Sequence, residues 1–375
     1  MKVLIVPNSY KECADSVEIS DLINKTLSEN TSIQTIVRPL SDGGDGFLPV
    51  IKNILDVVET KISFKNNHND LKSYKILVDR KTETAYLESA SVIGLKLIEE
   101  KRRNPLILNS ELIGKIINQL SVDINQSRLK IKNLVIGIGG TATIDFGIGA
   151  CSQLGLSLFD KNGNQLSAIP QNFKNVFSVK FIKSNLPFDI RCIVDVDTEL
   201  INEPGAIEIY GKQKGASEKD LKIIKSGIKN IIDLISADKK LNVPQKLNGA
   251  GGGLAAALNI FFKAEIIRAA DFIKNDILQG IDLDEIDTVI TGEGSFDFQS
   301  FEGKGAGIIL KLFAEKNISI FLINGSTNLL PHIKLSENVF RINLIDLFKS
   351  KEESIKNYKA GIAQATQIAV NYLIK

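Results

Sequence analysis

The chain has 375 residues, which at about 150 residues per domain suggests two or three domains. Its 46 Lys and Arg nearly balance its 44 Asp and Glu, and this argues against a nucleic-acid binder, which would concentrate basic charge. The hydrophobic content of 43% excludes global disorder, and a total of 2 His nearly excludes a His-rich metal site.

The three cysteines, Cys13, Cys151 and Cys192, are widely spaced and form no CxxC motif. They are predicted to be ordinary thiols in a reducing compartment, with Cys151 and Cys192 in the core. His68 and His332 are predicted to be loop residues, and a Ser-His-Asp hydrolase would need one of them as its base. The first apolar run is too short for a signal peptide, and no run approaches about 18 apolar residues. We therefore expect a soluble, cytoplasmic protein.

Short apolar runs that end in small or acidic residues are the main signal along the chain. Unbroken β-branched runs of this length suit strands that are buried on both faces of a parallel sheet. Two stretches, 16–27 and 219–235, have apolar residues at helical spacing. Strands that alternate with helices indicate an α/β fold. In chain order, the predicted strands are residues 3–6, 35–37, 134–136, 192–194, 288–290 and 321–323.

One region departs from this alternation. Residues 60–91 read as three strand-like runs, TKISFK, YKILVD and TAYLESAS, with no helix between them, which predicts an antiparallel patch. We therefore expect two α/β domains. A doubly wound, flavodoxin- or Rossmann-like parallel-sheet domain is predicted for 1–58 plus 284–375, and an inserted α/β domain with a mixed sheet for 59–283.

The loops after the predicted strands are rich in Gly and carboxylates. In open parallel sheets, ligands bind beyond the carboxyl ends of the strands. Gly lets the backbone approach a phosphate closely, and carboxylates can hold Mg²⁺ or accept a proton. Three lysines near such loops, Lys11, Lys214 and Lys304, could neutralise phosphate charge. Together these features indicate phosphoryl transfer.

The standard nucleotide-binding signatures are absent. No GxxxxGK[ST] occurs, because the Gly-Lys pair at 303–304 is followed by Gly305. Residues 137–142 match GxGxxG weakly, without an acidic residue that clearly serves a ribose about 20 residues further on. A kinase would therefore have to use another scaffold.

Each loop feature also has a structural interpretation. Asp195 and Asp197 alternate along a predicted strand end and could be metal ligands or a cap for the next element. Asp297 follows the GEG loop and could be catalytic or an N-cap. The glycines at 251–253 could form a helix start that binds an anion, or they could permit close helix packing.

A series of these segments, taken in order, resembles the bacterial glycerate kinases of the type that forms 2-phosphoglycerate. Each segment alone is weak, but together they run in register from the first strand to about Ser326 and make the family assignment strong. The segments are VPNSYK (6–11), PLSDGGDG (39–46), GIGGTATIDFGIGA (137–150), DVDTEL (195–200), EPGAIEIYGKQKGAS (203–217), NGAGGGLAAAL (248–258) and ITGEGSFDFQSFEGKG (290–305).

The chain also departs from the family pattern. Asn8 stands where the family usually has Asp, Ile144 and Phe146 replace Asn and Gly, and Ser295 stands where many members have Arg. The segment 104–112 is shorter and less polar than the family's Thr-Thr-Ser-Tyr-Gly-type loop. These departures motivate an alternative, a catalytically impaired member that binds a sugar acid or nucleotide as a sensor. A nucleotide-dependent dehydrogenase, suggested by the α/β rhythm and the Gly loops, lacks a clear fingerprint.

The resemblance implies ATP-dependent, Mg²⁺-assisted phosphorylation of D-glycerate, with 2-phosphoglycerate as the expected product and an interdomain cleft as the expected site. Nucleic-acid and membrane partners are not expected, and the oligomeric state, a homodimer included, stays open. The general base is left open among Asp42, Asp145, Glu293 and Asp297. The candidate residues are Lys11, Asp42, Asp145, Glu293, Asp297 and Lys304 for catalysis, Gly139, Gly140, Thr141, Lys214, Gly251, Gly252, Gly253 and Gly292 for ATP, and Asp195 and Asp197 for Mg²⁺.

Overall fold

The computed structural model describes residues 1–10, 13–65, 70–195, 197–302, 305–329 and 333–374. The chain forms two compact units, of which unit 1 consists of Met1–Asp42, Pro49–Leu55 and Ala269–Lys375. Unit 2 consists of Gly43–Leu48 and Asp56–Arg268. The expected mixed α/β class is confirmed. The domain boundaries expected after residue 58 and before residue 284 stay a prediction.

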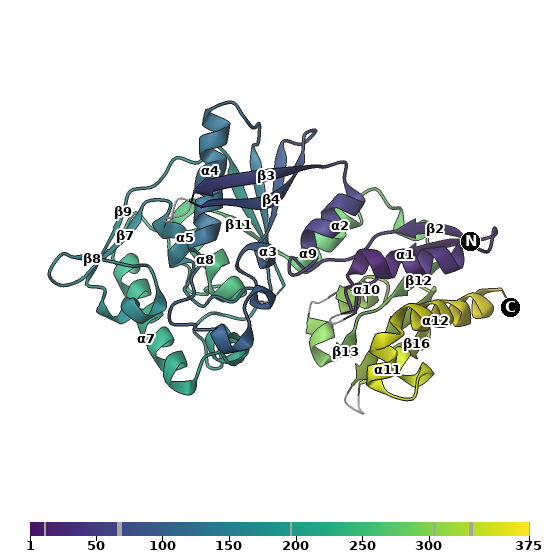
Figure 1. The fold of residues 1–375 in the computed structure, drawn as a ribbon. Coiled ribbons are helices and arrows are strands. Elements are labelled where there is room, and N and C mark those ends of the chain that lie inside the picture. Colours follow the sequence, from purple (N-terminus) through teal and green to yellow (C-terminus); the bar gives the residue numbers. More distant parts are fainter. Residues whose placement is uncertain (11–12, 66–69, 196, 303–304, 330–332, 375) are drawn as a thin grey trace. The chain divides into compact units, whose positions relative to one another are not determined.

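Unit 1 is built on a five-stranded parallel sheet in the order β16-β14-β12-β1-β2. Strands β2, β12 and β16 of this sheet are labelled in Figure 1. Its strands are Lys2–Ile5 (β1), Gln34–Val37 (β2), Thr288–Thr291 (β12), Ser319–Asn324 (β14) and Val339–Asn343 (β16). Ser295–Asp297 (β13) and Ser326–Asn328 (β15) form a separate parallel pair. Because the sheet is parallel, the loops that follow β1, β12 and β14 all emerge at one edge.

Helices cover this sheet, and the local sequence explains the first of them. The α-helices are Ser16–Leu27 (α1), Phe47–Ile54 (α2, which begins in unit 2), Ala269–Phe272 (α9), Gly305–Leu312 (α10), Lys351–Lys356 (α11) and Tyr358–Leu373 (α12), with short turns at Ile273–Ile277, Leu283–Glu285, Phe298–Glu302 and Leu344–Leu347. Asp15 caps α1 by accepting a hydrogen bond from Glu18 N–H at 2.8 Å. Ile19, Ile23 and Leu27 of α1 are buried in one core with residues of α12, beside which α1 lies. The helix predicted for 16–27 is confirmed.

Unit 2 is built on a six-stranded mixed sheet in the order β11-β10-β6-β5-β4-β3. Its strands are Val58–Lys65 (β3), Leu71–Asp79 (β4), Thr84–Glu88 (β5), Asn133–Ile138 (β6), Asp189–Val194 (β10) and Glu265–Arg268 (β11). The β3–β4 and β4–β5 pairs are antiparallel and the other pairs are parallel, so the predicted antiparallel patch and mixed sheet are confirmed. All six strands predicted from apolar runs are also present in the two sheets.

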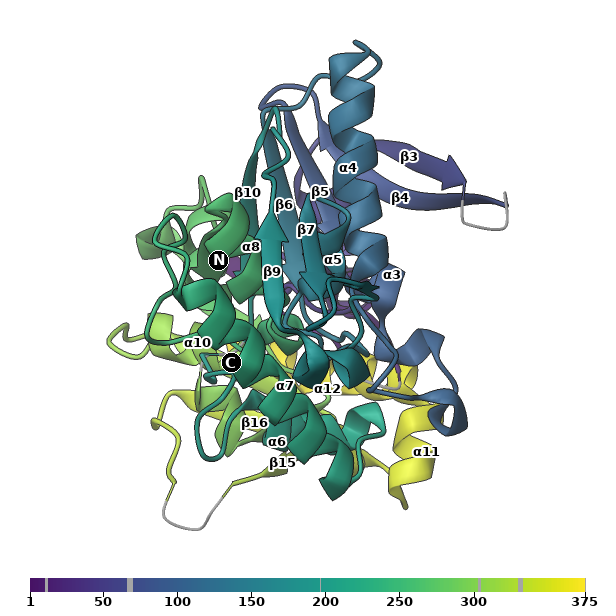
Figure 2. The ribbon, with the colours of Figure 1, turned by 90° about the vertical axis from the view of Figure 1, so that its left-hand side faces the viewer.

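Among the described residues of unit 2, apolar side chains gather in two of the cores of the protein. One joins the mixed sheet to Glu111–Asn125 (α4), which runs along the sheet in Figure 2. The other surrounds Glu218–Ser236 (α7), where a Ser217–Asp220 capping box begins the helix that was predicted for 219–235. The remaining helices are Ala90–Ile93 (α3), Ile148–Ser152 (α5), Ala206–Gly211 (α6) and Leu254–Phe262 (α8). A small antiparallel sheet contains Leu156–Phe159 (β7), Gln165–Leu166 (β8) and Ser178–Phe181 (β9). Short helical turns lie at Leu95–Leu97, Glu100–Arg102, Pro170–Asn175, Lys212–Lys214 and Ala250–Gly252.

Cys151 and Cys192 are buried, as predicted.

Among the residues that the structure describes, no helix combines the length and the apolar character that a membrane crossing requires.

Candidate active site

The carboxyl ends of β5, β6 and β10 form the edge of the unit 2 sheet where the sequence predicts phosphate binding. The loop after β6, residues 139–147, is here called the glycine loop, and all of it except Gly140 is buried. Segment 43–48 packs on the same edge, since a Cβ on Gly137 would lie 2.6 Å from the Gly43 carbonyl oxygen. This close approach is possible only because position 137 lacks a side chain.

Glu88, at the end of β5, was not predicted and holds segment 43–48. Its Oε2 accepts a hydrogen bond from Leu48 N–H at 2.9 Å, at the start of α2. Burial raises the pKa of Glu88, while the backbone N–H groups of residues 46–48 act in the opposite direction. Nearby Asp45 pairs with Lys96 at 2.9 Å. Glu88 is the last residue of β5, and its contact with Leu48, 40 residues away in the sequence, has no local sequence signal.

Asp145 is fully buried within the glycine loop. Its Oδ2 accepts hydrogen bonds from Ser110 N–H at 2.8 Å, the Ser110 hydroxyl at 2.7 Å and Gly149 N–H at 3.0 Å. Its Oδ1 has no hydrogen-bond partner within the described parts of the chain. Burial raises the pKa of Asp145, and the Ser110 and Gly149 donors oppose this shift. The carboxylate is therefore held firmly at one oxygen.

Lys214 places a buried positive charge behind the same loop. Its Nζ donates to Thr143 O at 3.0 Å and to Thr141 Oγ1 at 3.3 Å. Burial lowers the pKa of Lys214 to about 8, although the charges of Asp145 and Asp195 raise it. Lys214 thus connects Thr141 and Thr143 of the glycine loop, and its positive charge offsets the negative charge of Asp145 in the same loop.

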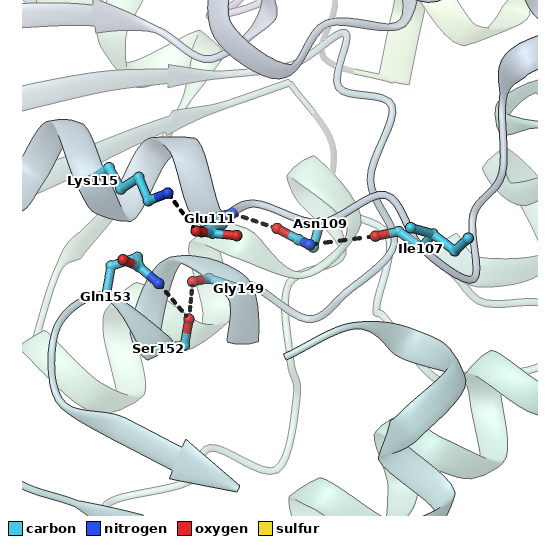
Figure 3. Close-up of polar contacts among 7 residues, drawn as sticks. All are labelled: Ile107, Asn109, Glu111, Lys115, Gly149, Ser152 and Gln153. Atoms are coloured by element: carbon cyan, nitrogen blue, oxygen red, sulfur yellow. Dashed lines mark hydrogen bonds and ion pairs between the residues drawn. The ribbon is translucent and has the colours of Figure 1, made fainter. Parts of the chain in front are cut away.

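The segment that presents Ser110 was noted in the sequence only as shorter and less polar than the family's loop. Figure 3 shows Asn109 and Glu111 on this segment, close to Gly149 of α5. Glu111 N–H donates to Asn109 Oδ1 at 2.8 Å, and Asn109 Nδ2 donates to Ile107 O at 3.3 Å. These local bonds define the turn that places Ser110 between α4 and α5. No feature of the sequence had singled out Ser110.

The glycines at 251–253 pack closely against the glycine loop. All three have positive φ, and a Cβ on Gly252 would lie 2.1 Å from Thr143 O. Gly252 O accepts from Phe146 N–H at 2.9 Å, and Gly252 N–H and Gly253 N–H donate to Gly249 O at 3.0 and 3.3 Å. This is the close-packing interpretation, and a direct contact of these glycines with ATP stays a prediction.

Gly252→Ala is expected to destabilise unit 2 more than a glycine replacement in open space. The cost of a positive φ is about 1–2 kcal/mol, and overpacking against Thr143 O adds about 1–3 kcal/mol. Gly163→Ala is the matched control, because Gly163 also has positive φ but a Cβ there would meet nothing within 4 Å. Urea unfolding of both variants measures the difference. Equal losses of stability would show that the contact with Thr143 is unimportant.

Asp195 and Asp197 follow β10, with Asp195 half-buried and Asp197 exposed. Among the described residues, no three or more His, Cys, Asp or Glu side chains gather closely enough to hold a metal ion. A site at these two carboxylates would therefore be completed by water and substrate oxygens. Such a donor set suits Mg²⁺, which commonly binds one or two carboxylates together with substrate phosphates.

A second group of candidates lies in unit 1, at the carboxyl ends of β1, β12 and β14. Asn8 N–H donates to Gly292 O at 2.8 Å, and Glu293 N–H donates to Asn324 Oδ1 at 3.2 Å. A Cβ on Gly292 would lie 1.5 Å from Ile323 O, so only glycine fits between these strands. The Glu293 side chain is buried at this edge.

Two further candidates lie in unit 1, and two lie outside the described residues. Asp42 and Asp297 are half-buried in unit 1, and Asp297 N–H donates to the Ser300 hydroxyl at 3.1 Å. Lys11 and Lys304 lie outside the described residues, as do His68 and His332. Unit 2 thus brings together the glycine loop, Lys214 and residues 251–253, whereas unit 1 brings together Gly292 and Glu293.

Two departures from the family pattern have a packing role. Ile144 and Phe146, at 2% and 0% exposure, belong to the core around α7. Phe146 adopts a positive φ of 52°, which is uncommon for a bulky residue. These side chains anchor the glycine loop in the apolar core and do not reach solvent. Their replacement of Asn and Gly is therefore compatible with an intact loop.

Comparison with known proteins gives consistent matches. The profile of the Glycerate kinase family matches residues 3–373. Glycerate kinase of Neisseria meningitidis serogroup B is 30% identical over 363 residues, which are 95% of this chain and 94% of the relative. Glycerate 2-kinase of Escherichia coli is 31% identical over 311 residues, 81% of this chain and 80% of the relative. A crystal structure assigned to glycerate kinase 2 of Salmonella typhimurium LT2 shares the fold, with a TM-score of 0.77 over 100% of this chain and 98% of that chain at 24% identity.

Proposed function

The chain belongs to the glycerate kinase family and is a kinase, and we propose that it transfers the γ-phosphoryl group of ATP to D-glycerate, with Mg²⁺, to form 2-phosphoglycerate. The family match along residues 3–373 is the observation that carries this proposal. The chain also covers 94% of the Neisseria glycerate kinase, so the similarity extends over nearly the whole relative.

The glycine loop is the proposed binding site of the ATP phosphates, through backbone N–H groups of Gly139, Gly140 and Thr141. Backbone N–H groups that converge in a glycine-rich loop are effective anion donors. Lys214 supports this assignment because its buried charge is hydrogen-bonded to Thr141 and Thr143. A fixed positive charge in a site that excludes water stabilises transferring phosphate more than it would in solution.

Asp195 and Asp197 are the proposed Mg²⁺ ligands, directly or through water. Their carboxylate oxygens suit this hard cation, and their position after β10 puts them on the same sheet edge as the glycine loop. Mg²⁺, when bound, would offset negative charge on the phosphoryl group. The two side chains would hold the cation at the phosphates and orient the group that is transferred.

The glycerate hydroxyl needs a carboxylate that orients it and accepts its proton. The candidates are Asp42, Asp145, Glu293 and Asp297. We favour the three in unit 1, because Asp145 is fully buried and one of its oxygens already accepts three hydrogen bonds. Lys11 or Lys304 is proposed to hold the glycerate carboxylate or the transferring group.

Purified protein with ATP, Mg²⁺ and D-glycerate is expected to release ADP in a coupled assay. Proton-coupled phosphorus NMR of the product distinguishes the two hydroxyls, because 2-phosphoglycerate gives a doublet and 3-phosphoglycerate a triplet. Reactions without glycerate, or with EDTA in place of Mg²⁺, are the controls. ADP release no faster than in the glycerate-free control would refute the proposal.

Three further measurements on the same purified protein separate the alternatives. A sensor would show thermal stabilisation by glycerate or nucleotide without turnover, and the departures at Asn8, Ile144 and the segment 104–112 motivate this alternative. A dehydrogenase would produce an absorbance change with NAD and would not need ATP. A panel of related hydroxy acids would show whether the sequence departures change the substrate.

A further inference from the structure

We propose that Ser110 is a positioning residue of the phosphate site, which holds the Asp145 carboxylate and through it the glycine loop. The inference rests on the proposed function, because that function places the ATP phosphates at this loop. Ser110 lies directly before α4, within the segment 104–112, and is fully buried.

Ser110 contacts Asp145 through both its backbone and its side chain. The backbone N–H and the hydroxyl donate to the same oxygen, Oδ2, at 2.8 and 2.7 Å. The Ser110 hydroxyl also accepts from Ala150 N–H at 2.9 Å, so its own proton is directed toward Asp145. Gly149 N–H completes the set at 3.0 Å. One carboxylate oxygen is thereby fixed between the starts of α4 and α5.

The orientation of Asp145 matters because its charge lies near Lys214. That lysine interacts electrostatically with both Asp145 and Asp195, and it donates to Thr141 and Thr143 of the glycine loop. A buried carboxylate that loses a donor must turn or take up a proton, because the lost hydrogen bond cannot be replaced by water. Either response would change the electrostatic interaction between Asp145 and Lys214. The hydrogen bonds by which Lys214 holds the glycine loop would then be weakened.

Ser110→Ala removes the hydroxyl and retains the backbone donor. We expect the Kd of a non-hydrolysable ATP analogue and the KM for ATP to rise about tenfold or more, because a hydrogen bond to a charged group is lost. The KM for glycerate should change less than about threefold, since the loop is proposed to bind phosphate and not glycerate. Ser110→Thr keeps the hydroxyl and should restore nucleotide affinity to within about threefold.

Ser20→Ala is the matched control. Ser20 is also a fully buried serine, its hydroxyl donates to Ser16 O at 2.8 Å, and it lies in unit 1 on α1. A similar rise in Kd for this control would show a general effect of a lost buried hydroxyl and overturn the inference. Wild-type analogue affinity and KM in Ser110→Ala would also overturn it.

Calorimetric titration with the analogue, without glycerate, keeps this test independent of turnover. A wild-type protein that binds the analogue but does not phosphorylate glycerate refutes the proposed function, while the effect of Ser110→Ala on binding still decides the inference. If Ser110→Ala does not fold, Ser110→Cys takes its place, because it keeps the side-chain size and replaces a strong donor by a weak one. Its Kd is judged by the same tenfold criterion.

Discussion

Lys214→Met is expected to lower kcat/KM for ATP by about 100-fold or more. The buried ammonium donates to Thr141 Oγ1 and Thr143 O, and these two bonds join the glycine loop to the turn after α6. Hydrogen bonds from a charged donor contribute about 1.5–3 kcal/mol each, and about 1.4 kcal/mol corresponds to a factor of ten. Methionine has a similar length but cannot donate, so the loop would lose its brace and its positive charge.

The same substitution should change how stability depends on pH. The Lys214 pKa is near 10.5 in the unfolded chain and about 8 in the folded chain. Between these values the unfolded state binds more protons, so the folded wild type gains stability as the pH rises from 8 to 10.5. Relative to Lys214→Met, that gain should approach about 3 kcal/mol. Urea unfolding of both proteins at pH 7 and pH 10.5 measures it.

Lys212→Met supplies the control for both measurements. Lys212 lies in the same short turn, but it is exposed and pairs with Glu218 at 2.7 Å. Lys212→Met should leave kcat/KM for ATP unchanged. Relative to Lys212→Met, the wild type should not gain stability between pH 8 and 10.5. In the wild type, kcat/KM should fall as the pH rises through about 8, because Lys214 then loses its proton. The pH dependence of kcat/KM reports the pKa values of groups in the free enzyme. A Lys214→Met variant with near-normal kcat/KM would exclude Lys214 from the phosphate site.

The central strands of both sheets could be predicted because their sequences are apolar without interruption. The run at 134–136 becomes part of β6, which has a parallel neighbour on each side and is almost entirely buried. The strands at the margins could not be predicted in this way. β16 is half-exposed or exposed throughout and β11 has one buried residue, so neither contains a long apolar run. Their place is set by pairing with β14 and β10.

Some residues of the candidate site could also be predicted from the sequence, and others could not. The glycine loop was predictable because close backbone approach demands glycine, and its residues stand together in the sequence. Glu88 and Ser110 were not predictable, since each acts on a partner distant in the chain. Glu88 holds Leu48 across 40 residues, and Ser110 holds Asp145 across 35 residues. A lone Glu or Ser has no local pattern that reveals such a contact.

Asp145→Ala is expected to destabilise the protein by about 3–5 kcal/mol, because each buried donor that is left without its acceptor costs about 1–3 kcal/mol. Three donors, from Ser110 and Gly149, would lose their acceptor, and the Lys214 charge would lose a compensating carboxylate. Asp21→Ala on α1 is the control, because Asp21 is exposed. Its effect should stay within about 0.5 kcal/mol. Equal effects of the two variants in urea unfolding would contradict the bracing role of Asp145.

The pair Asp145 and Lys214 can be tested further by combining the two substitutions. Asp145→Ala removes a negative charge that acts on the buried Lys214 ammonium, and Lys214→Met removes the positive charge that acts on the buried Asp145 carboxylate. The double variant leaves neither charge, so its loss of stability should be smaller than the sum of the single losses by about 1 kcal/mol or more. Additivity within about 0.5 kcal/mol would mean that the two groups act independently. The sign of this coupling therefore decides whether the aspartate and the lysine form one electrostatic unit behind the glycine loop.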